Sequence, residues 1–150
     1  MVLIDLDVYK DSRGSFLECY QKERYKEHGI NVDFVQDNHS HSTKNVLRGM
    51  HFQINHPQGH LVYVVRGDIF DVGVDIRRGS PTYGQWQGFR LSESRPQQLF
   101  LPAGVAHGFW TLSDKADILY KCTDYFDSDD EGGLLWCDSD LKIDWPIDQP

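Results

Sequence analysis

The sequence predicts an all-β domain, either a sandwich or a barrel, formed by residues 1–150 as one unit. The chain has 150 residues, a length that suits a single domain with a substantial core. Aromatic residues make up 13% of it, and these residue types favour strands. Most of the chain consists of short runs in which apolar and polar residues alternate, separated by turn residues, which is typical of all-β folds.

The clearest unit is a pair of strands within residues 60–77. A first alternating run ends at the turn Arg66–Asp68, and a second run follows with apolar residues at every other position of Phe70–Ile76. The opposite face of this second strand carries Asp71 and Asp75. These two carboxylates are either solvated, as most surface acids are, or they line a polar cavity inside a barrel and orient other polar side chains.

The remaining elements follow from the same pattern. Turns are expected at Pro81 and at Pro102–Gly104, and a short charged helix at residues 22–28, ending at Gly29. The tail from Asp127 to Pro150 is predicted to be irregular. Further strands are expected at residues 85–91, 98–101, 107–112 and 118–125.

Charge and cysteine content exclude several functions. The formal net charge is −8 without a basic stripe, so the sequence predicts no nucleic-acid partner, although a few arginines can still hold a small anion. Cys19, Cys122 and Cys137 are too widely spaced for a disulfide framework and suit a reducing compartment. Residues 1–10 contain Asp5, Asp7 and Lys10 and are not expected to act as a signal peptide, and no apolar run reaches transmembrane length. A cytoplasmic protein with no membrane partner is therefore expected.

The seven histidines invite a metal site, but their spacing argues against one. Metal-binding β-barrels usually place two histidines one residue apart on a strand, whereas His51 is followed by Phe52 and Gln53. His39 and His41 have that spacing, but they lie in the polar stretch 37–45, which is predicted to be a loop. Neither a metal nor another cofactor is expected.

Acid–base chemistry is the stronger candidate. Arg48 and His51 differ in strand parity, so Gly49 must bend the backbone if both side chains are to share a pocket. His107 directly follows a tight turn, and Tyr120 lies in an alternating run. A His, a Tyr and an Arg can together supply a base, an acid and an anion clamp, although a lone His or Tyr in a β-barrel more often has a structural role. Nucleophile-elbow and phosphate-binding glycine motifs are absent.

Six segments in order along the chain belong to one pattern: residues 11–20, 34–53, 60–86, 101–114, 119–126 and 136–146. Taken together, they resemble the dTDP-4-dehydrorhamnose 3,5-epimerase family over nearly the whole chain. The resemblance implies a cupin jelly roll (double-stranded β-helix) and a homodimer that exchanges N-terminal strands. It also implies metal-free epimerisation at C3, C5 or both of a nucleotide-diphosphate-linked 4-keto-6-deoxy sugar, through an enolate, in deoxysugar and polysaccharide biosynthesis.

Site residues transfer position by position from this resemblance. His51 matches the family's general base, Tyr120 its general acid, and Arg48 a substrate-binding residue beside the base. Phe126 falls where the family has an aromatic residue that stacks on the nucleobase, and Phe16 is expected beside it as a further substrate-binding residue. Six more residues match positions that contact the nucleotide-sugar: Arg13, Glu18, Gln36, Asn38, His107 and Glu131.

Two departures from the family pattern affect the site. His60 stands where the family has a Lys that donates to the C4 oxygen. The family also has a C-terminal Asp that orients the catalytic His, and no residue of this sequence matches it. Asp144, Asp148 or a water molecule is the candidate for that role here. Two alternatives remain open: a related 3,4-ketoisomerase, and a non-catalytic cupin that binds a nucleotide-sugar or another carbohydrate.

Overall fold

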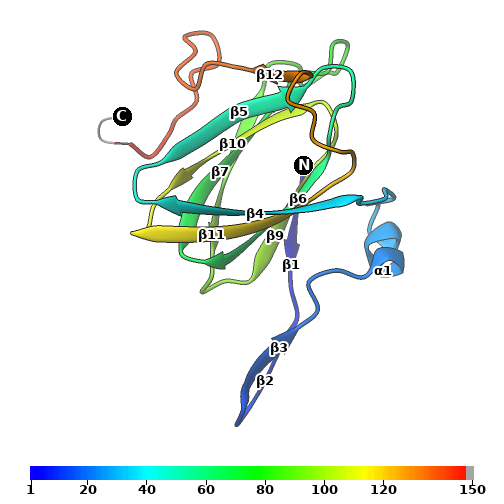
Figure 1. Cartoon of the computed structure of the whole chain (residues 1–150), viewed down its shortest axis with the longest axis vertical. Helices are drawn as coiled ribbons and strands as arrows, with labels where there is room; N and C mark the ends of the chain where they lie inside the picture. Colours follow the sequence, from blue (N-terminus) through cyan, green and yellow to red (C-terminus); the bar gives the residue numbers. More distant parts are fainter. Residues whose placement is uncertain (148–150) are drawn as a thin grey trace.

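The computed structural model describes residues 1–147 and shows two antiparallel five-stranded sheets that face each other (Figure 1). Within this part of the chain, no helix is long and apolar enough to cross a membrane. The first sheet has the strand order β1 (Val2–Asp5), β9 (Gln97–Leu101), β6 (His60–Arg66), β11 (Lys115–Cys122) and β4 (Gln36–Thr43). The second sheet has the order β12 (Glu131–Gly133), β5 (Leu47–Gln53), β10 (Val105–Thr111), β7 (Asp68–Asp75) and β8 (Trp86–Ser92).

The main core lies between the two sheets. Alternation places Val62 and Val64 of β6 on the inner face of the first sheet, where they meet Ile69 of β7 and Phe109 of β10 from the second. All four side chains are buried. The predicted all-β jelly-roll class is confirmed, and the barrel consists of two facing sheets rather than one closed ring.

A second apolar cluster covers the outer face of the second sheet. Val72 and Val74 point outward from β7 and pack with Trp145, whose indole N–H donates to the Trp136 carbonyl at 2.8 Å. The predicted irregular tail therefore acts as a cover for this sheet, and it also contains the short strand β12.

The N-terminal region supplies a hairpin of β2 (Val8–Asp11) and β3 (Gly14–Leu17), followed by the helix α1 (Lys22–Glu27). Figure 1 shows the hairpin projecting away from the two sheets. Phe16 of this hairpin is 68% exposed, which is unusual for a large aromatic residue in a single chain. The helix matches its prediction and ends before Gly29, whose φ of +87° suits glycine.

The prediction of a loop at residues 37–45 was wrong. Most of this stretch is strand β4, which pairs with β11 along its whole length. It is polar because one face lines a polar pocket, while the other places His39 and His41 against Asp117 at the sheet surface. His39 Nε2 lies 3.0 Å and His41 Nδ1 lies 2.9 Å from the same oxygen, Oδ1 of Asp117. The polar residues of this strand face the pocket on one side and solvent on the other, so their polarity does not indicate a lack of regular structure.

The buried Asp75 carboxylate is held by Arg77, Ser80 and Thr82, with the guanidinium nitrogens at 2.9 and 2.7 Å. The Arg77 hydrogen bonds hold the pKa of Asp75 well below its usual range. A depressed carboxyl pKa stabilises the fold above the unfolded-state pKa of about 3.9, and this contribution is lost as pH falls through the lower folded-state pKa.

We therefore expect Asp75→Asn to lower the free energy of unfolding by about 3 kcal/mol near neutral pH. Urea denaturation of both proteins across a pH series measures the difference. The difference in free energy of unfolding between the two proteins should become smaller in acid, because the wild-type carboxylate is then protonated. A difference that stayed constant down to about pH 2 would show that the charge is not responsible.

Candidate active site

A pocket of about 230 Å³ opens between the two sheets and gathers most of the predicted site residues. Its first wall comes from β4, β6 and β11, and its second from β5 and β10. Eight of the residues that line it were predicted from the sequence: Asn38, Arg48, His51, His60, His107, Tyr120, Phe126 and Glu131.

Arg48 and His51 share this pocket because β5 is irregular between them. In the pairing of β5 with β10, His51 lies opposite His107, but Arg48 lies opposite Phe109, so three steps along β5 match two along β10. The backbone bends at Gly49, which has φ +113°. The bend predicted from the parity of the two side chains is thus present.

We expect Gly49→Ala to destabilise the protein by about 2–5 kcal/mol and to separate Arg48 from His51. A Cβ atom at this position would lie 2.5 Å from the Gly108 Cα, a backbone atom that cannot move aside. Chemical denaturation and the turnover rate measure both effects.

The matched control is Gly79→Ala, because Gly79 also has a positive φ but its Cβ would meet no atom within 4 Å. This control substitution should lower the free energy of unfolding by only about 1–2 kcal/mol and leave turnover unchanged. Equal losses in the two variants would show that close contact with Gly108 does not matter.

His51 has a carboxylate neighbour, but not the one expected. Its Nδ1 lies 3.5 Å from Oε1 of Glu131, because β12 pairs with β5 beside it. Asp144 makes no ion pair with His51, since its neighbours Ile143 and Trp145 pack on the outer face of the second sheet. Asp148 lies outside the described residues. The His51 side chain is 59% exposed, so this wall of the pocket is open.

Arg48 is oriented by two acceptors on β4. Its Nε donates to Ser42 Oγ at 3.0 Å and one terminal nitrogen to the His41 carbonyl at 3.1 Å. The remaining guanidinium hydrogens are available to an anionic group in the pocket.

Tyr120 lies on the wall opposite His51, since it belongs to β11 of the first sheet. Burial raises its pKa, which keeps the phenol protonated, while hydrogen bonding from Asn38 and the charge of Arg48 act in the opposite direction. The His60 ring lies edge-on to Tyr120, with centroids 5.6 Å apart.

His60 and His107 meet at the inner end of the pocket, with ring centroids 5.4 Å apart. Burial, and then the charge of His107, lower the pKa of His60 to about 3. His107 Nε2 lies 3.0 and 2.9 Å from the two oxygens of Asp71, whose side chain is fully buried. Of the two interpretations of Asp71, the structure favours the internal one, in which the carboxylate orients another polar side chain.

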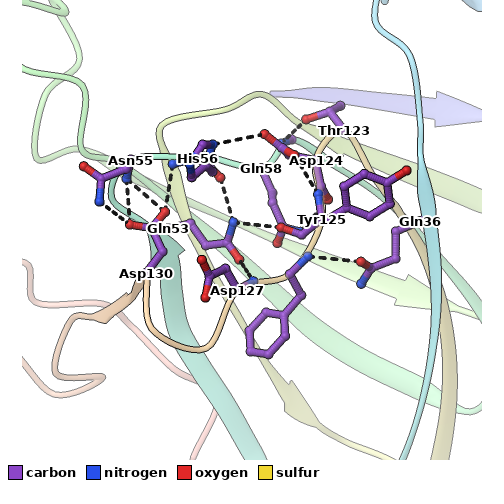
Figure 2. Close-up of polar contacts among 12 residues, drawn as sticks. Gln36, Gln53, Asn55, His56, Gln58, Thr123, Asp124, Tyr125, Asp127 and Asp130 are labelled. Atoms are coloured by element: carbon purple, nitrogen blue, oxygen red, sulfur yellow. Dashed lines mark hydrogen bonds and ion pairs between the residues drawn. The ribbon is translucent and has the colours of Figure 1, made fainter.

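A loop at residues 124–130 forms the rim of the pocket, and glutamines hold it in place (Figure 2). The buried Gln53 amide donates to the Tyr125 carbonyl at 3.1 Å and accepts from the Asp127 N–H at 2.7 Å. Gln36 accepts from the Phe126 N–H at 3.0 Å, which connects the predicted residue Gln36 to the predicted aromatic residue. Gln53 was not among the predicted site residues, although strand alternation places it on the same face as His51.

Four predicted residues do not line the pocket of their own chain. One is Gln36, which holds the rim at Phe126, and the other three come from the N-terminal region. Arg13 and Phe16 belong to the projecting hairpin, where Asp11 pairs with the Arg13 guanidinium. Glu18 follows the hairpin and pairs with Arg24 of α1. Within residues 1–147, no group of three or more His, Cys, Asp and Glu side chains is arranged to hold a metal ion.

Comparison with known proteins identifies the family. The sequence profile described as dTDP-4-dehydrorhamnose 3,5-epimerase matches residues 1–150. The chain belongs to this family. A dTDP-4-dehydrorhamnose 3,5-epimerase from Pseudomonas aeruginosa is 50% identical over 148 residues, which cover 98% of this chain and 82% of the relative. One from Methanothermobacter thermautotrophicus is 48% identical over 147 residues, covering 98% and 80%.

A solved structure supports the same family assignment. The dTDP-6-deoxy-D-glucose-3,5-epimerase from Legionella pneumophila, determined in complex with dTDP-4-keto-L-rhamnose, is 51% identical with a TM-score of 0.94. The match covers 97% of this chain and 78% of that one. This 3,5-epimerase family protein is therefore an enzyme of the isomerase class, as predicted. The comparisons support neither of the two alternatives, the 3,4-ketoisomerase and the non-catalytic cupin.

Proposed function

We propose that the protein inverts C3, C5 or both of a nucleotide-diphosphate-linked 4-keto-6-deoxy sugar, with His51 as the base and Tyr120 as the acid. The observation that carries this proposal is the position of the two side chains on opposite walls of one pocket. A base on one face of the sugar and an acid on the other produce inversion. The names of the relatives point to a dTDP-linked substrate.

The reaction needs no change of oxidation state. His51 takes the proton from a carbon beside the ketone, the electron pair moves to the C4 oxygen as an enolate, and Tyr120 returns a proton to the opposite face. Both C3 and C5 flank the same ketone, so one base–acid pair can serve both carbons. Donors aimed at the C4 oxygen lower the barrier because the negative charge develops there.

Product analysis tests this function. The protein is incubated with dTDP-4-keto-6-deoxyglucose, and the ring-proton couplings of the product are measured by NMR. Inverted couplings at C3 or C5 are the expected result. Tight binding with no change in couplings would contradict epimerisation and favour a non-catalytic binding protein.

The site is proposed to be completed by a second copy of the chain. The β2–β3 hairpin projects from the sheets, its Phe16 is exposed, and the pocket wall at His51 is open (Figure 1). In a homodimer that exchanges this segment, the partner's hairpin covers the open wall and brings a cation and an aromatic ring to the nucleotide. The three free cysteines suit a reducing compartment such as the cytoplasm.

A mixing experiment tests this arrangement. Arg13→Ala and His51→Ala are each expected to be nearly inactive alone. After denaturation and refolding together, mixed dimers contain sites with His51 from one chain and Arg13 from the other, so activity should reappear. Activity equal to the sum of the two separate variants would show that each hairpin serves its own chain.

A further inference from the structure

Two imidazole rings share the inner end of the pocket with one buried carboxylate. His60 and His107 have ring centroids 5.4 Å apart, and Asp71 contacts only the second of them. Two positive charges this close in a partly buried site would repel each other strongly, whereas a single charge beside a carboxylate forms a neutral pair. The arrangement therefore favours a single positive charge on the pair, carried by one of the two rings.

Hydrogen bonds set the proton positions on both rings. An ionised carboxylate only accepts, so Asp71 fixes a proton on His107 Nε2. His60 Nε2 lies 3.3 Å from the Gln58 Oε1, which likewise accepts, so this nitrogen carries the proton of a neutral ring. Gln58 is held in turn by donating to the Asp124 carbonyl at 2.7 Å. The second ring nitrogen, Nδ1, consequently differs between the two rings. In His60 it carries a lone pair and can accept, and in His107 it has no hydrogen-bond partner among residues 1–147 and can hold a second proton.

We propose that Asp71 is a positioning residue that places the single positive charge of this ring pair on His107, leaving His60 neutral. This inference rests on the proposed epimerase function. The His107 imidazolium then donates Nδ1–H to the ketone oxygen where the enolate charge develops, and His60 contributes shape and an acceptor instead of charge. Asp71 itself touches no substrate, because it is fully buried behind His107.

Among residues 1–147, the other charged groups around the pocket lie further from His107 than Asp71 does. His107 lies opposite His51 on β5, and Arg48 is two register positions further along. Tyr120 is protonated, and Glu131 lies beside His51. Asp71 is the only carboxylate within ion-pair distance of His107 among residues 1–147.

The first test is histidine side-chain NMR of the wild-type protein without substrate, with ring nitrogens labelled and assigned through His60→Gln and His107→Gln. At about neutral pH, His107 is expected to carry protons on both nitrogens and His60 on Nε2 alone. A neutral His107, or a charged His60, would overturn the proposal. This readout does not depend on turnover, so it stays informative if the proposed reaction fails.

The second test is the pH profile of Asp71→Asn, which preserves shape and removes the charge. At about pH 8, kcat is expected to fall about 100-fold, with a smaller effect on KM, because His107 loses its second proton. The ratio of variant to wild-type kcat should recover as pH falls through about 6.5, where an ordinary histidine gains a proton.

The matched control is Asp75→Asn, which removes another buried carboxylate from the same strand, away from the pocket. It should lower stability without changing the pH profile of kcat. A loss of activity in Asp71→Asn that was the same at every pH would mean that Asp71 only supports the fold. If wild-type protein catalysed no reaction while NMR showed the charge on His107, the function would be wrong and the charge assignment right.

Discussion

Replacing His51 by alanine is expected to reduce exchange and inversion at the carbons beside the ketone by about 10²–10⁴-fold. The pocket contains other histidines, but they cannot substitute. His107 is engaged with Asp71, and burial holds the pKa of His60 to about 3. A group with so low a pKa is a poor acceptor for a carbon-bound proton at neutral pH.

The fold should tolerate this change. The His51 side chain is 59% exposed and belongs to neither apolar cluster, so the free energy of unfolding should change by less than about 0.5 kcal/mol. His56→Ala is the matched control, because His56 is an exposed histidine near the rim whose side chain pairs with Asp124. Wild-type exchange in His51→Ala would remove His51 from the mechanism.

Tyr120→Phe is expected to separate proton removal from inversion. Without the phenol on the opposite wall, the enolate regains its proton on the face from which it was lost. Isotope exchange should therefore continue, while inversion falls about 10²-fold. The phenyl ring preserves the edge-on contact with His60, so packing should change little. Substrate recovered from heavy water should carry deuterium without a change in configuration.

Tyr25→Phe provides the control for this variant. Tyr25 is also a buried tyrosine, and burial raises its pKa to about 12, but it lies on α1 and donates to Gln98. Its replacement should reduce stability by about 1 kcal/mol and leave the ratio of inversion to exchange unchanged. If Tyr120→Phe inverted the substrate at the wild-type rate, another acid would have to act.

Sequence patterns correctly predicted the strands and the helix whose formation depends on residues close together in the sequence. The strand pair at residues 60–77 and the helix near residues 22–28 follow from alternation and a glycine stop. The bend at Gly49 follows from the parity of its neighbours. The failure at residues 37–45 has a physical cause: a strand whose inner face lines a polar pocket looks like a loop when read alone.

Contacts between distant residues could not be predicted in this way. Glu131 lies beside His51 only because β12 pairs with β5, and nothing near either residue indicates that pairing. The choice between a solvated and an internal Asp71 likewise depended on which sheet covers β7. The family resemblance supplied the site residues, and the structure added their neighbours: Gln53 at the rim and Asp71 behind His107.

Proton NMR of dTDP-4-keto-6-deoxyglucose with the wild-type protein in D₂O tests the central claim most directly. An acid–base pair on either side of the ketone should introduce deuterium at C3, C5 or both, with inverted couplings at each exchanged carbon. Deuterium at both carbons would identify a double epimerase, and deuterium at one a single-site epimerase. Full retention of both protons by a folded, substrate-binding protein would contradict enolate chemistry in this pocket.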